Sequence, residues 1–151
     1  MRLLRLYIGE YRVLSQLDMR FDPGQPQEVR DRHYHLDFLV GVNGTGKSTA
    51  LRLLGRIFKG VQKSFDELRD LPFVLEYWLE SQNKRVLISN IDPSELTPLA
   101  GYFVTTAPGL NDAYEKEEPD EQYLVDNVPA NLLPERIIAY TTGNEIEWIA
   151  D

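Results

Sequence analysis

The chain has 151 residues, of which 42% are hydrophobic, 16 are lysine or arginine and 24 are aspartate or glutamate, so the formal net charge is −8. This size and apolar content suit a single domain, and the lack of cysteine excludes disulfides, thiolate metal sites and cysteine nucleophiles. The sequence has no apolar run of about 18 residues, no secretory leader and no long basic run, so we expect a cytoplasmic chain that binds nucleic acid poorly by itself.

Two strand candidates open the chain. The apolar run 3–8 is typical of a strand, Gly9-Glu10 is a turn, and 13–21 has the apolar spacing of a second strand. The segment 22–32 contains Asp-Pro-Gly-Gln-Pro, which predicts a surface loop. The run 36–40 that follows has the length and apolar character of a buried parallel strand.

Residues 41–49 read Gly-Val-Asn-Gly-Thr-Gly-Lys-Ser-Thr, a complete phosphate-binding loop of the G-x-x-x-x-G-K-[ST] type. Its glycines allow a close approach of backbone N–H groups to an anion, and the positive end of the following helix adds to the attraction. Lys47 offers a point charge for the β- and γ-phosphates, and the Ser48 hydroxyl can complete a Mg²⁺ shell. Apolar residues then recur at helical spacing up to Gly60, which we expect to be the C-cap. The sequence therefore predicts binding of a nucleoside triphosphate.

The rest of the chain contains further strand candidates and one polar segment. The runs 73–79 and 85–91 predict a hairpin with a short connection, and 102–106 predicts another strand. Residues 108–122 are acidic and poor in apolar side chains, so we expect an exposed, mobile loop there. The apolar run 136–140 is typical of a returning strand, and 145–150 of the start of another element.

The order of strand, Tyr11-Arg12-Val13-Leu14 turn, second strand and glycine loop resembles the N-terminal head segment of ABC-type ATPases. The closest groups are the SMC/RecF-like branch and the AAA-family ATPases associated with restriction and anti-phage systems, whose Gly-x-Asn-Gly-Ser/Thr-Gly-Lys-Ser-Thr pattern this loop matches. The resemblance implies an α/β P-loop NTPase fold with a mixed or antiparallel, strand-rich subdomain. It divides the chain into a loop-bearing part (1–60), the strand-rich subdomain (61–107), an acidic loop region (108–135) and a returning strand (136–151).

The resemblance also implies roles for individual residues. Contacts to ATP are implied for Asn43, Gly44, Thr45, Gly46, Lys47, Ser48 and Thr49. Among these, Ser48 would bind Mg²⁺ and Thr49 would reach the α-phosphate. Such heads often place an arginine after the first strand, which would be Arg12, although a solvated arginine in a turn explains this residue equally well. Tyr7 or Tyr11 would lie near adenine, whereas an aromatic at a strand end more often belongs to the core.

The family's signature motif, Walker B carboxylates and switch histidine have no counterpart in these 151 residues, so the catalytic residues stay unassigned. We expect the chain to be the N-terminal part of a longer ATPase and to be inactive in hydrolysis alone. The resemblance implies a nucleotide-dependent homodimer that acts on DNA or on an effector nuclease. The alternative is a non-hydrolytic nucleotide sensor, in which ATP only shifts a conformation or an assembly.

Other polar and aromatic residues have simpler explanations. Aspartate and histidine alternate over 31–37 and would share one face of a strand, where a divalent metal could bind, but a polar strand face is the simpler interpretation. The acidic stretch within 108–122 lacks the ligand spacing of a calcium loop, which favours a solvated insertion. Trp78 and Trp148 are most simply packing residues.

Overall fold

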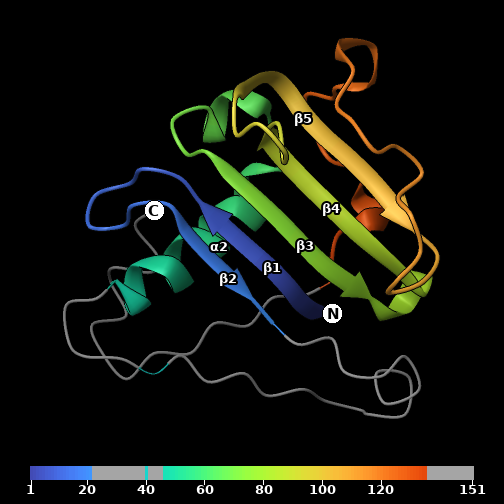
Figure 1. Cartoon of the computed structure of the whole chain (residues 1–151), viewed down its shortest axis with the longest axis horizontal. Helices are drawn as coiled ribbons and strands as arrows, with labels where there is room; N and C mark the ends of the chain where they lie inside the picture. Colours follow the sequence, from blue (N-terminus) through green and yellow to red (C-terminus); the bar gives the residue numbers. More distant parts are fainter. Residues whose placement is uncertain (22–39, 41–45, 136–151) are drawn as a thin grey trace.

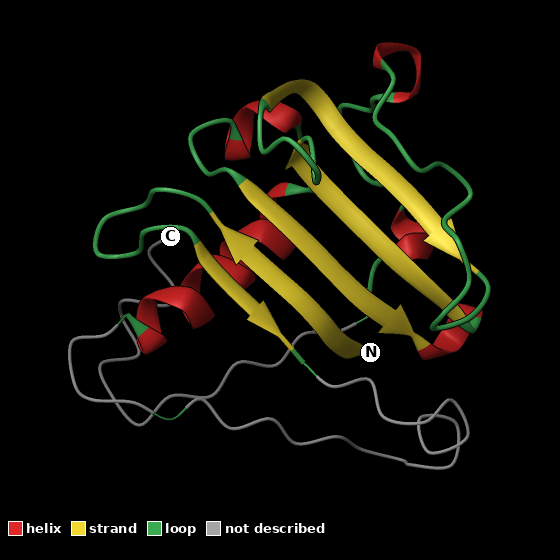
Figure 2. Ribbon diagram, in the orientation of Figure 1, coloured by secondary structure: helices red, strands yellow, loops and turns green. Residues whose placement is uncertain are grey.

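The computed structural model describes residues 1–21, 40 and 46–135. These residues form a mixed α/β structure around one five-stranded sheet, and Figure 2 shows its strands side by side. The strands are β1 (Arg2–Ile8), β2 (Leu17–Arg20), β3 (Phe73–Leu79), β4 (Lys84–Ile91) and β5 (Pro98–Ala107), in the spatial order β2-β1-β3-β4-β5. Helix α2 (Lys47–Gly60) lies behind the sheet in Figure 1. Four short 3₁₀ helices accompany it: η1 (Phe65–Leu68), η2 (Glu80–Gln82), η3 (Glu121–Tyr123) and η4 (Ala130–Leu132).

The face of the sheet that packs against α2, here called the inner face, holds the main core. Alternate residues of the strands point to it, because successive side chains in a strand lie on opposite faces. The helix contributes buried residues at the spacing of one helical face. The principal members are Leu6 and Ile8 of β1, Phe73, Leu75, Tyr77 and Leu79 of β3, Val86 and Ile88 of β4, Tyr102 of β5, and Ala50, Leu53, Ile57 and Phe58 of α2.

A register shift lets β1 bury apolar side chains on both faces of the sheet. The pairing of β1 with β3 is irregular between Leu3 and Arg5. Leu3 and Leu6 therefore both pack into the core beside α2, although they are three residues apart. Leu4 packs on the opposite face. Strict alternation would have placed Leu4 and Leu6 on the same face. The irregularity therefore lets the leucines of β1 pack into cores on both faces of the sheet.

The opposite, outer face is covered by the segment 108–124, which follows β5. Leu110 of this segment packs with Leu4 and Trp78. Tyr114 packs against a second small cluster centred on β3, β4 and β5. The packing role expected for Trp78 is thereby confirmed, and the acidic segment has a place in the fold that its composition did not indicate.

Arg85 of β4 holds this segment to the sheet. Its guanidinium donates to the backbone carbonyl oxygens of Leu110 and Asp112, each at 2.5 Å. It also lies over the Tyr114 ring, 4.3 Å from the ring centroid, while the Tyr114 hydroxyl donates to Glu76 at 2.5 Å. Many side chains of the segment are exposed as expected, but its backbone is packed and hydrogen-bonded against the sheet rather than loose.

The predicted hairpin is confirmed, and the ends of the other strands differ from expectation. Strand β3 has the expected bounds, β4 starts one residue earlier, and the two pair antiparallel. Strand β5 starts at Pro98 instead of 102. The second strand was expected over 13–21, but a tight turn occupies the start of that range and β2 covers only Leu17–Arg20.

The α/β class is confirmed, whereas the P-loop NTPase fold is not shown. Each strand pair in the described part of the chain is antiparallel. The parallel strand expected at 36–40 falls outside the described residues except for residue 40, and the elements expected at 136–140 and 145–150 fall outside them entirely. The division expected at residue 60 does not split the sheet, because β1 pairs directly with β3. None of the described helices is long and apolar enough to cross a membrane.

Gly60 serves close packing and not capping. Helix α2 includes Gly60, and the C-cap is Val61 in a right-handed helical conformation. A Cβ on Gly60 would lie 2.6 Å from Cγ of Leu68, which belongs to η1. The expected C-cap at Gly60 is therefore wrong, and the glycine leaves room for the Leu68 side chain, which would have to move if residue 60 carried a Cβ.

Candidate functional site

The N-terminus of α2 begins at a glycine that no other residue could replace without strain. Gly46 has φ 87°, in the left-handed region. A Cβ there would also overlap Cδ2 of Leu14. No side chain caps the helix in the described structure, and its first turn contains no acidic residue. The N-terminal end of α2 therefore keeps its positive partial charge, because no carboxylate in its first turn neutralises the exposed N–H groups.

Three candidate residues form the first turn of the helix. Ser48 is exposed, while Lys47 and Thr49 are half-buried. Because a helix turns about 100° per residue, the three side chains leave α2 in different directions. Thr49 lines a groove beside the helix. Asn43, Gly44 and Thr45 lie outside the described residues, so their phosphate contacts stay predictions.

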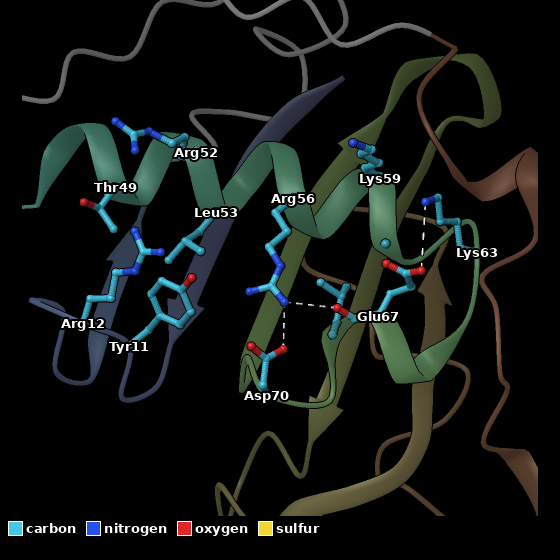
Figure 3. A pocket seen from close by; sticks show the side chains of 12 residues that line it. Tyr11, Arg12, Thr49, Arg52, Leu53, Arg56, Lys59, Lys63, Glu67 and Asp70 are labelled. Atoms are coloured by element: carbon cyan, nitrogen blue, oxygen red, sulfur yellow. Dashed lines mark hydrogen bonds and ion pairs between the residues drawn. The ribbon is translucent and has the colours of Figure 1, made fainter. Parts of the chain in front are cut away.

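The groove has a volume of about 450 Å³ and follows α2 from Thr49 to its C-terminal end, as Figure 3 shows. Helix α2 forms one wall, and the turn after β1 with the η1 region forms the other. Its volume falls in the range of small-molecule sites, about 300–1,000 Å³. The lining residues are Tyr11, Arg12, Thr49, Arg52, Leu53, Arg56, Lys59, Gly60, Lys63, Glu67, Leu68 and Asp70.

Arg12 reaches the groove from a tight turn that also contacts Gly46. The backbone N–H of Tyr11 donates to the carbonyl of Leu14 at 3.0 Å, and the N–H of Leu14 donates back at 2.9 Å. Arg12 has φ 52° in this turn, a conformation that glycine adopts more readily. Its guanidinium carbon is 5.4 Å from the centroid of the Tyr11 ring. The same turn therefore places Leu14 against Gly46 and Arg12 at the groove that Thr49 lines.

Arg56 crosses the middle of the groove. Its Nη2 donates to Oδ1 of Asp70 at 2.8 Å and to the backbone carbonyl of Glu67 at 3.2 Å, drawn as dashed lines in Figure 3. Burial lowers the pKa of Arg56, but the hydrogen bond and charge of Asp70 outweigh burial, so the pKa lies above its usual value. Arg56 therefore stays charged and ties α2 to the opposite wall, 6.0 Å from the Tyr11 ring centroid.

Basic residues gather at this groove, which the sequence did not lead us to expect. Five of the chain's 16 lysines and arginines line it, against two carboxylates, Glu67 and Asp70. Four of the five recur at i, i+4, i+7 and i+11, the spacing of one helical face. These four, here called the basic face, are Arg52, Arg56, Lys59 and Lys63. Their helical spacing is visible in the sequence, but the four residues are not contiguous and therefore do not form a basic run.

The other aromatic and polar residues singled out in the sequence lie in the core, at the groove or outside the described residues. Tyr7 is buried in the outer cluster, so its structural interpretation is confirmed, while Tyr11 is half-buried at the groove. The histidine-containing run 31–37 and Trp148 lie outside the described residues. Among the residues that the structure describes, no group of three or more histidine, cysteine, aspartate or glutamate side chains could hold a metal.

Comparisons with known proteins assign no family to the chain. No protein-family model matches the chain, and a search of curated proteins finds no matching sequence. The resemblance to ABC-type ATPases therefore remains an expectation, founded on residues 41–49 and on the order of the elements around them. The function has to be inferred from the start of α2 and from the groove beside it.

Proposed function

We propose that the chain binds ATP with Mg²⁺ at the N-terminus of α2 and is the ATP-binding part of an ABC- or SMC-like ATPase. The observation that carries the proposal is the junction of the glycine loop with the helix. Gly46 is left-handed, a Cβ there would overlap the Leu14 side chain, and in the described part of the chain the helix end has neither a side-chain cap nor an acidic residue in its first turn. A helix end of this kind attracts phosphate through its N–H groups and its positive partial charge.

Each residue of the first turn has a distinct task in this proposal. Lys47 donates to the β- and γ-phosphates, and the exposed Ser48 hydroxyl is one ligand of Mg²⁺, which neutralises the phosphate charge. Thr49 lies at the α-phosphate, where the groove begins. The ribose and the base then enter the groove beside Tyr11, Arg12 and Leu53. The loop residues Asn43, Gly44 and Thr45 complete the phosphate contacts.

We propose hydrolysis only for a head in which this site is joined by carboxylates that hold the metal and by a group that orients water. A second copy of the head would complete the exposed side of the γ-phosphate, so that ATP stabilises a cytoplasmic dimer. Action on DNA or on an effector nuclease follows from the ABC resemblance alone. A protein that binds ATP without turnover or dimerisation would instead be a nucleotide sensor.

Lys47→Ala tests the proposal. The substitution removes a charge-assisted contact, so we expect ATP affinity to fall by about 1.5–3 kcal/mol, which is roughly 10- to 150-fold. Isothermal titration calorimetry with ATP and Mg²⁺ measures this change. Lys84→Ala, which removes a half-buried lysine of β4, is the matched control and should bind like the native chain. Equal ATP affinity of the native chain and Lys47→Ala would reject the site.

A further inference from the structure

The ion pair of Arg56 with Asp70 divides the groove into two parts. Arg56 extends from α2, Asp70 lies on the opposite wall, and Nη2 of Arg56 donates to Oδ1 of Asp70 at 2.8 Å. Figure 3 shows Tyr11, Leu53 and Thr49 on one side of this pair and the lysines near the end of α2 on the other. The part of the groove that begins at Thr49, here called the near part, is therefore bounded at its far end by a guanidinium and a carboxylate.

The near part has the length that a nucleoside requires. A helix rises about 1.5 Å per residue, so Arg56 lies about 10 Å past Thr49 along the axis of α2. With covalent bonds of about 1.3–1.5 Å, a ribose with its purine base extends roughly 10 Å from the α-phosphate. A nucleotide whose α-phosphate lies at Thr49 therefore brings the outer edge of its base to the pair of Arg56 and Asp70.

The walls of the near part suit a purine base. Leu53 of α2 is buried, and Tyr11 lines the groove from the turn after β1. Apolar and aromatic side chains of this kind contact the faces of a base, whereas a few polar groups at the end of the site select its edge. Asp70 and Arg56 are the polar groups that this edge would meet.

Asp70 can accept a further hydrogen bond while it stays paired with Arg56. The Asp70 side chain is 64% exposed, so a ligand in the groove can approach it. An ionised carboxylate accepts at about four lone-pair positions on its two oxygens, and a single bond to Arg56 does not exhaust them. Figure 3 shows the second carboxylate oxygen of Asp70 turned toward the side of the groove where Tyr11 lies. A donor on the base can therefore reach this oxygen from the near part.

We propose that Asp70 accepts a hydrogen bond from the exocyclic amino group of adenine and thereby selects ATP among the purine nucleotides. This inference rests on the proposed function and deepens it. Arg56 is a positioning residue, because it holds the carboxylate of Asp70 from the helix side. Guanine presents two adjacent N–H donors, which pair best with both oxygens of a carboxylate. Adenine fits better, because one oxygen of Asp70 already accepts from Arg56 and the single amino group needs only the other.

Matched ligands on the full chain test the inference. Calorimetry with Mg²⁺ compares ATP with purine riboside 5′-triphosphate, which is ATP without the amino group. We expect the native chain to bind ATP about tenfold more tightly, because the hydrogen bond to a charged acceptor is lost with the amino group. GTP should also bind about tenfold more weakly than ATP, since its carbonyl oxygen would face the carboxylate with no donor between them. Equal affinity for ATP and purine riboside triphosphate, or GTP binding at least as tight as that of ATP, overturns the inference.

Variants decide whether Asp70 supplies the preference for the amino group. Asp70→Ala should bind ATP and purine riboside triphosphate equally, because the acceptor is gone. Arg56→Gln keeps the carboxylate and a side chain that can still donate to it, so the preference for ATP should persist. Asp66→Ala is the control and should also keep the preference, because Asp66 is an exposed aspartate that pairs with Arg69 at 2.7 Å and does not line the groove. Thermal unfolding of each variant verifies that it is folded.

The outcomes separate this inference from the proposed function. A preference for ATP that survives in Asp70→Ala overturns the inference, and so does its loss in Arg56→Gln or Asp66→Ala, since the carboxylate of Asp70 would then not set the selectivity. These results leave the proposed ATP binding standing. Failure of the native chain to bind any of the three nucleotides overturns the proposed function together with the inference. A preference that is lost in Asp70→Ala and retained in the other two variants assigns the contact with the base to Asp70.

Discussion

The two faces of the sheet are covered in different ways. On the inner face, α2 and η1 close over one continuous apolar cluster that runs from β1 to β5. On the outer face, the segment 108–124 covers two separate small clusters, and the polar group of Glu76, Arg85 and Tyr114 lies on the same face. Apolar packing therefore dominates the inner face, while specific hydrogen bonds hold the outer cover.

This difference matters for the candidate site, because the groove runs along α2, the helix that packs on the inner face. The helix that carries Lys47, Ser48 and Thr49 is anchored by buried residues such as Leu53 and Ile57. Its position thus depends on the larger core and not on the polar segment. A site on a packed helix holds its geometry better than one on a surface segment.

The largest expected effect compares two phenylalanines, one on each face. Phe73 of the inner face and Phe103 of the outer face are both essentially buried. Phe73→Ala should lower the free energy of unfolding by about 3–5 kcal/mol, because it leaves a cavity in a continuous core. Phe103→Ala should cost less, since a small cluster beneath a surface segment can collapse around the loss. Urea denaturation measures both, and a larger loss for Phe103→Ala would refute the ranking of the two faces.

A smaller effect should follow from release of the outer cover. Arg85→Ala removes both hydrogen bonds to the carbonyls of Leu110 and Asp112, so we expect a loss of about 2–3 kcal/mol. Limited proteolysis should also become faster within 108–122. The neighbouring Lys84→Ala is the control, because its 3.9 Å ion pair with Glu115 is exposed and should contribute below about 1 kcal/mol. Unchanged cleavage of Arg85→Ala would mean that apolar contacts alone hold the segment.

The smallest effect separates the two glycines of α2. Nothing lies within 4 Å of a Cβ built on Gly55, so Gly55→Ala should stabilise the chain by about 0.5–1 kcal/mol through helix propensity. Gly60→Ala should instead destabilise it by about 1 kcal/mol or more, because its methyl group would overlap Leu68. Thermal unfolding compares the two variants. Stabilisation by Gly60→Ala would show that the Leu68 side chain moves aside at little cost.

Local patterns in the sequence predicted much of the described fold. The hairpin at β3 and β4 was predictable because two apolar runs flank a short polar connection. The helix after the loop was predictable because its buried residues recur with a period close to 3.6. The bounds of β2 were not, because the residues at 13–16 are apolar or neutral enough for a strand but form a turn and its exit instead.

The sequence by itself determined the local chemistry at the start of α2: a glycine that can take a left-handed conformation, a lysine, a hydroxyl and an amphipathic helix behind them. Such features depend on residues that are neighbours in the chain. Only the tertiary structure decided that the turn at Arg12 lies against Gly46, that 108–124 packs on the outer face, and that five basic side chains line one groove. These outcomes depend on contacts between distant segments, and the shape and burial that select them exist only once the sheet has formed.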